Sequence, residues 1–244
     1  MGRKEGTGFM YEFTSRIRYS ETGPDARLSL SGLVDYFQDC CVFHSVSIGR
    51  GPDVWKKEHY GWMITSWQIV IDSYPKLNDL VTTRTWAYRF HAFEGDRNHT
   101  MKNEKGSVLS YANSRWVFYD MELGRPVRVP KVEIEGYGVE PELEMEKGPL
   151  HIHLPSENVT TRHPFKVRAT NIDTNGHVNN EQYIMMALAY LPANIRTREL
   201  RVEYLHQARL GDTLLPKVAI EEYNYTVWLE NEEGLPCAVM RFMV

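Results

Sequence analysis

The sequence predicts an α+β protein built from two similar units, each with one long helix wrapped by an antiparallel sheet. The first observation is an internal repeat: segments that begin at Arg18 and Arg168 run in parallel along the chain without a gap. The second is that each segment leads into runs rich in Trp, Tyr, Val, Ile and Thr, which are typical of strands. A chain of 244 residues can hold one large or two small domains, and the repeat favours two.

A helix is predicted at the start of each unit, because apolar residues recur there at helical spacing. In the first unit this apolar set is Leu30, Leu33, Val34, Phe37 and Cys41. In the second unit it is Tyr183, Ile184, Ala187, Leu188 and Leu191. The second helix should begin after an N-cap at Asn179, with Gln182 reaching back to the cap, and should end near Pro192.

Strands should follow each helix, separated by turns that contain Gly, Asn and Asp. The predicted strands of the first unit are Met63 to Asp72, Leu80 to Phe90 and Val108 to Tyr119. Those of the second unit are Glu199 to Gln207, Thr213 to Glu222, Tyr225 to Glu230 and Ala238 to Val244. The stretch between the units is rich in Glu, Gly and Pro and is interpreted as an acidic linker. The predicted bounds are 1–130 for the first unit, 131–160 for the linker and 161–244 for the second unit.

A dense polar turn, Asp173 to His177, precedes the second helix. Its Asn175-Gly176 step tolerates positive φ and reverses the chain easily. Asp173 and His177 can move protons, and the amide of Asn175 can hold a water or a carbonyl. The backbone N–H groups of residues 178–180 are expected to be unpaired, which would suit a carbonyl oxygen that gains negative charge. The alternative is an Asx-rich turn that only caps the helix, and local sequence leaves both open.

The repeat assigns any chemistry to the second unit. At the positions of Asp173, Asn175 and His177, the first unit has Gly23, Asp25 and Arg27. Five of the six tryptophans, in contrast, lie in the first unit. The first unit is therefore interpreted as having lost the polar set and kept bulky apolar side chains.

These residues resemble a known family. The run from His163 through Tyr183, with Val202-Glu-Tyr-Leu-His-Gln207-Ala208 downstream, resembles the C-terminal half of an acyl-acyl carrier protein thioesterase. The segment from Phe13 to Gly51 resembles the N-terminal half of that family. The resemblance implies a tandem of two hotdog domains. It also implies hydrolysis of fatty acyl-carrier thioesters to free fatty acid and carrier protein, in fatty acid biosynthesis, with acyl-chain selection in the first domain.

The chain departs from the family at one place. Relatives carry a Glu, and the plant enzymes also a Cys, in the stretch that reads Gln207-Ala208 here. Ala208 excludes a thiol nucleophile, and the Gln207 amide cannot act as a base, although it can orient a water. The resemblance then implies water attack, in which His177 and Asp173 manage the proton while Asn175 and Gln207 position water and carbonyl. No metal or organic cofactor is implied.

Two other functions stay open at this point. Hotdog dehydratases also place a His near a helix N-terminus, and they act on 3-hydroxyacyl thioesters, but Gln207 leaves no candidate acid opposite His177. A non-catalytic acyl-binding module is the other alternative, because an amide stands where relatives hold a carboxylate.

Composition limits the partners. The net charge of −4 and the pI near 6.2 disfavour a nucleic-acid partner, which would need a basic surface. No apolar run approaches the ~18 residues of a membrane span, and residues 1–20 lack the pattern of a signal peptide. Cys40, Cys41 and Cys237 fit no metal or disulfide spacing and are expected in the core. A soluble cytoplasmic enzyme is predicted, with acyl carrier protein as partner and a homodimer left open.

Overall fold

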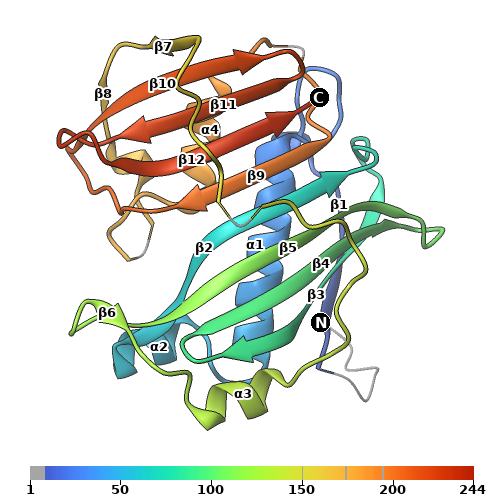
Figure 1. Cartoon of the computed structure of the whole chain (residues 1–244). Coiled ribbons are helices and arrows are strands. Elements are labelled where there is room, and N and C mark those ends of the chain that lie inside the picture. Colours follow the sequence, from blue (N-terminus) through green and yellow to red (C-terminus); the bar gives the residue numbers. More distant parts are fainter. Residues whose placement is uncertain (1–8, 150, 174, 194) are drawn as a thin grey trace. The chain divides into compact units, whose positions relative to one another are not determined.

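The computed structural model describes residues 9–149, 151–173, 175–193 and 195–244 (Figure 1). It divides into two compact units. The first contains residues up to Thr65 together with Ile69–Glu146, and the second contains Ser66–Gln68 and Lys147–Val244. The predicted boundary at residue 130 differs from this division, because residues 131–146 pack with the first unit rather than forming a linker.

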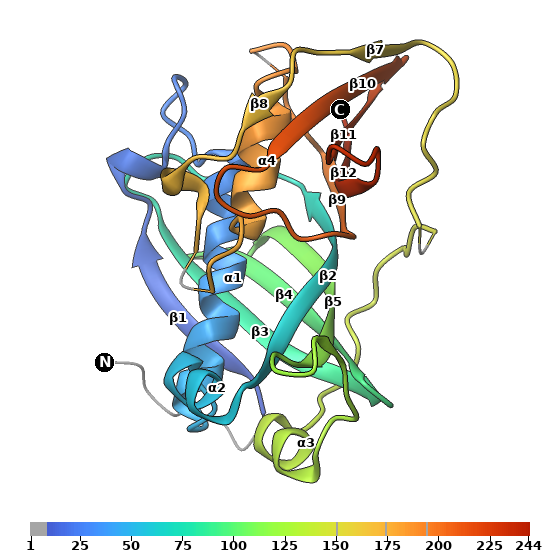
Figure 2. The same cartoon turned by 90° about the vertical axis from the view of Figure 1, so that its left-hand side faces the viewer.

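The first unit is a five-stranded sheet in the order β1-β3-β4-β5-β2, which curves around helix α1 (Leu30–Ser47) (Figure 2). The strands are β1 (Tyr11–Arg16), β2 (Tyr60–Ile71), β3 (Leu80–His91), β4 (Glu94–Asn103) and β5 (Val108–Asp120). Shorter elements are β6 (Arg125–Pro126), α2 (Pro52–Glu58), α3 (Lys131–Tyr137) and the 3-10 turn η1 (Tyr19–Glu21). The predicted apolar set of α1 is buried, and the Ser29 hydroxyl caps the helix by accepting the Gly32 N–H at 3.0 Å.

The two faces of the first sheet are covered differently. Cys40 and Cys41 of α1 lie against Thr83 and Thr85 of β3, so these alternate residues face the helix. On the opposite face, Trp86 Nε1 donates to the Pro141 carbonyl at 2.9 Å, and the Leu143 N–H donates to Asn98 Oδ1 at 2.9 Å. The acidic stretch after α3 therefore lies across this outer face as part of the fold.

A buried polar cluster lies between α1 and the first sheet. His44 Nδ1 accepts a hydrogen bond from Arg97 Nη2 at 2.7 Å, and the Arg97 guanidinium also lies over the Tyr137 ring. Tyr137 Oη and Ser45 Oγ are 2.7 Å apart. Burial, together with the charge of Arg97, lowers the pKa of His44 to about 3, so this imidazole is neutral and able to accept.

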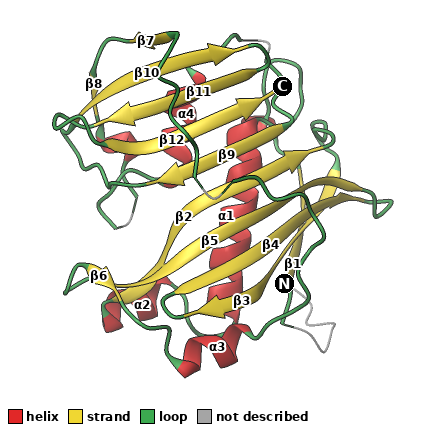
Figure 3. Ribbon diagram, in the orientation of Figure 1, coloured by secondary structure: helices red, strands yellow, loops and turns green. Residues whose placement is uncertain are grey.

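The second unit is a sheet in the order β9-β12-β11-β10-β7, with helix α4 (Asn180–Leu188) on one side (Figure 3). Its strands are β7 (Val159–Thr161), β9 (Glu199–Tyr204), β10 (Thr213–Glu221), β11 (Asn224–Glu230) and β12 (Pro236–Met243), and β8 (Phe165–Lys166) pairs with β10. The short 3-10 turn η2 (Ala169–Asn171) precedes the polar turn. The neighbouring strands β9, β12, β11 and β10 pair antiparallel, as predicted. Strand β7, which was not predicted, pairs antiparallel with β10.

Three predictions about these elements were wrong in detail. Helix α4 ends at Leu188, four residues before Pro192. Asn179 is the N-cap as predicted, but Gln182 does not reach back to it and instead accepts from Asn171 Nδ2 at 2.9 Å. Strand β9 ends at Tyr204, so Gln207 lies on the loop that follows the strand.

The three cysteines are buried and free, in line with the predicted core role. Within the described ranges, none of the helices is long and apolar enough to cross a membrane.

Candidate active site

Asp173 organises the polar turn that precedes α4. Its Oδ1 accepts the N–H groups of Asn175 at 2.8 Å and of His177 at 3.3 Å, while Oδ2 accepts Asn175 Nδ2 at 3.2 Å. The Asp173 N–H donates to the His177 carbonyl at 2.8 Å, and Gly176 takes a φ of +78°, as the Asn-Gly step predicted. Three of the four predicted residues are thus brought together. Thr174, which completes the motif, lies outside the described residues.

His177 is half-buried, and its ring nitrogens form no hydrogen bond with a described residue. Burial lowers the pKa of His177, the positive charge of Arg209 lowers it further, and the negative charge of Asp173 acts in the opposite direction. The imidazole is therefore in its neutral form near pH 7 and can accept a proton from water.

The start of α4 offers fewer donors than predicted. The Val178 N–H donates to the Ala208 carbonyl at 2.9 Å, and the Asn179 N–H donates to the Asn171 carbonyl at 2.9 Å. The Glu181 N–H is bound by the Asn179 side chain at 3.1 Å. The expectation of free N–H groups at Val178 and Asn179 was therefore wrong. Only the Asn180 N–H of this stretch makes no hydrogen bond to another described residue.

The hydrogen bond between Val178 and Ala208 brings the loop that contains Gln207 close to the polar turn. Ala208 is fixed on both sides, because its carbonyl accepts from Val178 and its N–H donates to Tyr183 Oη at 3.0 Å. His177 precedes Val178 and Gln207 precedes Ala208, so each is one residue away from this backbone pair. Gln207 is exposed on the loop, and Ala208 is 1% exposed.

Sequence reasoning missed Arg209, which follows Ala208 on the same loop. Its guanidinium is exposed and forms no hydrogen bond or ion pair with a described residue, although its charge acts on His177. The only local signal was the Arg209-Leu-Gly-Asp212 turn, which resembles Lys76-Leu-Asn-Asp79 of the first unit and indicated no more than a strand connection.

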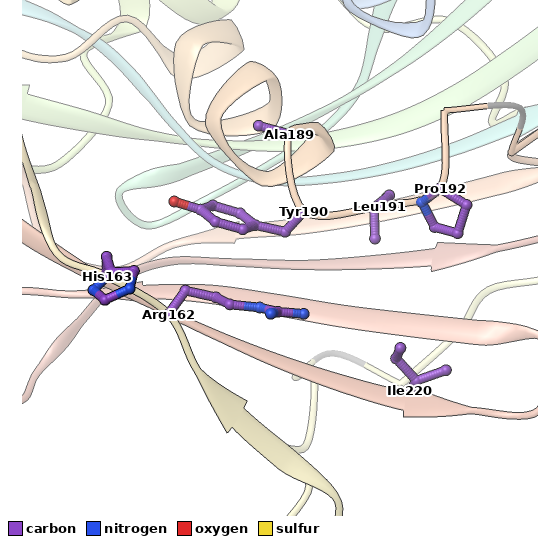
Figure 4. Close-up of a pocket in the computed structure, with 7 residues that line it drawn as sticks. All are labelled: Arg162, His163, Ala189, Tyr190, Leu191, Pro192 and Ile220. Atoms are coloured by element: carbon purple, nitrogen blue, oxygen red, sulfur yellow. The ribbon is translucent and has the colours of Figure 1, made fainter.

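A surface cavity of about 480 Å³ lies past the other end of α4. Figure 4 shows the Arg162 side chain running along it near Tyr190 and Leu191, with His163 at one end. None of the four predicted site residues lines this cavity. Among the described residues, no group of three or more His, Cys, Asp or Glu side chains could hold a metal ion.

Comparison with known proteins identifies the family. The model of the acyl-ACP thioesterase N-terminal domain matches residues 8–137, and the model of the C-terminal domain matches residues 155–238. The chain belongs to the acyl-ACP thioesterase family. An acyl-[acyl-carrier-protein] hydrolase of Cuphea viscosissima is 26% identical over 253 residues, which cover 93% of this chain and 60% of that protein. A palmitoyl-acyl carrier protein thioesterase of Arabidopsis thaliana is 26% identical over 237 residues, covering 90% and 57%. The chain thus spans about 60% of the length of these relatives.

Solved structures of family members have the same fold. An acyl-ACP thioesterase from Bacteroides thetaiotaomicron superposes with a TM-score of 0.87 at 21% identity, over 96% of this chain and 97% of that one. The 12:0-ACP thioesterase from Umbellularia californica superposes with a TM-score of 0.84 at 18% identity, over 98% of both chains. The predicted fold, two hotdog domains in tandem, is confirmed. The roles of Asp173, Asn175, His177 and Gln207 remain predictions.

Proposed function

We propose that this protein hydrolyses fatty acyl-acyl carrier protein thioesters to a free fatty acid and the carrier thiol. Family membership over both halves of the chain supports this reaction. The observation that carries it is the half-buried imidazole of His177, which has no hydrogen-bond partner among the described residues, follows Asp173 in the same turn, and has a pKa that burial lowers. In the reaction, the oxygen of water bonds to the carbonyl carbon, the C–S bond breaks, and the sulfur leaves with a proton.

In the proposed mechanism, His177 removes a proton from the attacking water and later delivers it to the leaving sulfur. Asp173 holds the turn in place, and its negative charge favours the imidazolium that forms in between. Asn175 and Gln207 are proposed to orient the water and the carbonyl, since both present amide groups near the turn. The Asn180 N–H is the one backbone donor of residues 178–180 that is available to the carbonyl oxygen.

Gln207→Glu should keep or raise activity and change its pH dependence. A carboxylate next to the Ala208–Val178 pair would add a base at the position where relatives hold Glu. We expect Gln207→Leu, which removes the hydrogen-bonding amide, to lower turnover. The measurement is kcat/KM against pH for the three proteins. Identical pH profiles and rates in all three would show that residue 207 takes no part in the reaction.

The first unit is proposed to bind and select the acyl chain. Phe37 is fully buried on α1 and packs against His99, with ring centroids 5.3 Å apart. Phe37→Leu should shift the preferred chain length and change the kcat/KM ratio of neighbouring lengths by about fourfold, because each methylene contributes ~0.8 kcal/mol. The measurement is hydrolysis of a panel of acyl-carrier thioesters.

A matched control lies in the second unit. Ile184 of α4 is also fully buried, at the position that the repeat pairs with Val34 of α1. Ile184→Val should leave the order of chain lengths unchanged. A shift with Ile184→Val and none with Phe37→Leu would assign chain selection to the second unit.

One incubation separates the three candidate functions. With a labelled long-chain acyl-carrier thioester and its 3-hydroxy analogue, a thioesterase releases free acid and a dehydratase gives the enoyl thioester. A binding module gives stoichiometric binding without turnover. Running the same acyl chain on coenzyme A tests whether the carrier protein is the preferred partner. Release of free acid is the expected result, and its absence would contradict the proposed function.

Location and assembly stay predictions. The names of the plant relatives place those proteins in the chloroplast. For this chain, the cytoplasm is the proposed location, to be tested by cell fractionation. A homodimer would be detected by light scattering of the purified protein.

A further inference from the structure

Arg209 occupies a fixed position beside the candidate active site. The Val178 N–H and the Ala208 carbonyl are joined at 2.9 Å, so His177 and Arg209 each lie one residue from the same backbone pair. The Arg209 N–H donates to Asp212 Oδ2 at 2.8 Å, which closes the turn after it. Hydrogen bonds therefore fix the backbone before and after the Arg209 side chain, so the position of its Cα is defined.

The charge of Arg209 is not neutralised by an ion pair with any residue that the structure describes. Arg50 pairs with Glu58 and Glu133, and Arg89 pairs with Asp96. Arg209 has no such ion pair with any described residue, because Asp212 binds its backbone N–H and not its guanidinium. An exposed cation without a counter-ion next to a polar turn is available to a negatively charged ligand.

A cation at this place would stabilise the charge that develops during thioester hydrolysis. Negative charge develops on the carbonyl oxygen during water attack and remains on the carboxylate product. The backbone donors expected to stabilise it at Val178 and Asn179 are already used within the protein. A guanidinium carries five N–H donors in a planar fork that matches two oxygens on one carbon.

We propose that Arg209 binds the reacting carboxyl group and stabilises its negative charge, first on the carbonyl oxygen in the transition state and then on the product carboxylate. This inference rests on the proposed hydrolysis and names the residue that supplies its electrostatic stabilisation. Gln207 and Arg209 then act from the same loop, one on the water and the other on the oxyanion.

Arg209 has a second effect through His177. The charged groups that act on this imidazole are Asp173 from its own turn and Arg209 from the facing loop. Arg209 disfavours the imidazolium, so it keeps His177 in the form that accepts a proton. Removal of the cation should raise the pKa of His177 and move the acid limb of the pH–rate profile to higher pH.

The test compares Arg209→Met, Arg209→Lys and the control Lys166→Met. Lys166 is also exposed and contacts the same loop, with its Nζ 3.4 Å from the Gly211 carbonyl. We expect Arg209→Met to lower kcat by about 10²-fold with little change in KM, the range for losing one oxyanion donor. Arg209→Lys should retain the pH profile and part of the rate, and Lys166→Met should behave like the wild type.

The proposal is wrong if Arg209→Met has the same kcat and the same pH profile as the wild type. A raised KM for carrier-bound substrate alone, with unchanged hydrolysis of a small acyl thioester, would instead make Arg209 a carrier-docking residue. The affinity for a fatty carboxylate, measured by calorimetry, needs no turnover. If the wild type proves inactive on thioesters, the proposed function fails, whereas equal carboxylate affinity in wild type and Arg209→Met rejects the Arg209 site independently.

Discussion

His177→Ala should lower the turnover of an acyl-carrier thioester by about 10²-fold or more, the range typical of losing a general base. The protein should stay folded, because the His177 ring makes no hydrogen bond to a described residue and is only half-buried. Asn175→Ala should also reduce kcat, because it removes the amide proposed to orient the water or the carbonyl. It should leave the protein folded, since the exposed Asn175 side chain forms a hydrogen bond only with Asp173 among the described residues. The measurement is kcat for each variant, together with its thermal unfolding midpoint.

A structural control separates chemistry from capping. Asn171 accepts the Arg168 N–H at 2.9 Å and donates to Gln182 at 2.9 Å, so it supports the turn without belonging to the proposed machinery. Asn171→Ala should lower the unfolding midpoint more than it lowers kcat. Parallel losses of activity and stability in His177→Ala would support the capping-network interpretation and contradict a catalytic role. Asp173→Ala cannot make this distinction, because Asp173 both holds the turn and acts on His177.

The parts of the fold that were predictable from sequence depend on local patterns. The apolar spacing of Leu33, Val34 and Phe37 predicted the buried face of α1, and the Asn179 cap predicted the start of α4. The repeat then predicted that the two units share one architecture, which the family structures confirm. In each case the signal lay within one helix or in a comparison of the chain with itself.

The predictions that failed concern contacts between distant segments. The N–H groups of Val178 and Asn179 were expected to be free, but their acceptors lie on Ala208 and Asn171. The acidic stretch after residue 130 was interpreted as a linker from its side chains, whereas it is held by backbone and tryptophan N–H groups that composition does not reveal. Arg209 was missed for the same reason, since only the pairing of Val178 with Ala208 brings it to the turn.

The first unit should lose stability as the pH falls from 7 to 5. Burial and the charge of Arg97 lower the pKa of His44 to about 3, against an ordinary value near 6.5, and burial lowers that of His99 as well. Below pH ~6.5 the unfolded chain therefore binds protons that the native protein excludes. The stabilisation is fully present above pH ~6.5 and is lost as the pH falls towards 3, at ~1.4 kcal/mol per pH unit for each histidine.

The contribution of His44 can be isolated by substitution. His44→Gln retains a neutral acceptor for Arg97 Nη2 but cannot titrate. Between pH 7 and 5, the unfolding free energy of this variant should therefore fall by about 2 kcal/mol less than that of the wild type. Urea unfolding followed by tryptophan fluorescence reports on the first unit through Trp62, Trp86 and Trp116. The exposed His163 provides the matched control, and His163→Gln should keep the wild-type slope. The prediction fails if the unfolding free energy of His44→Gln changes with pH as steeply as that of the wild type. That result would show that His44 becomes protonated in the native state and that its hydrogen bond with Arg97 breaks at acid pH without unfolding the unit.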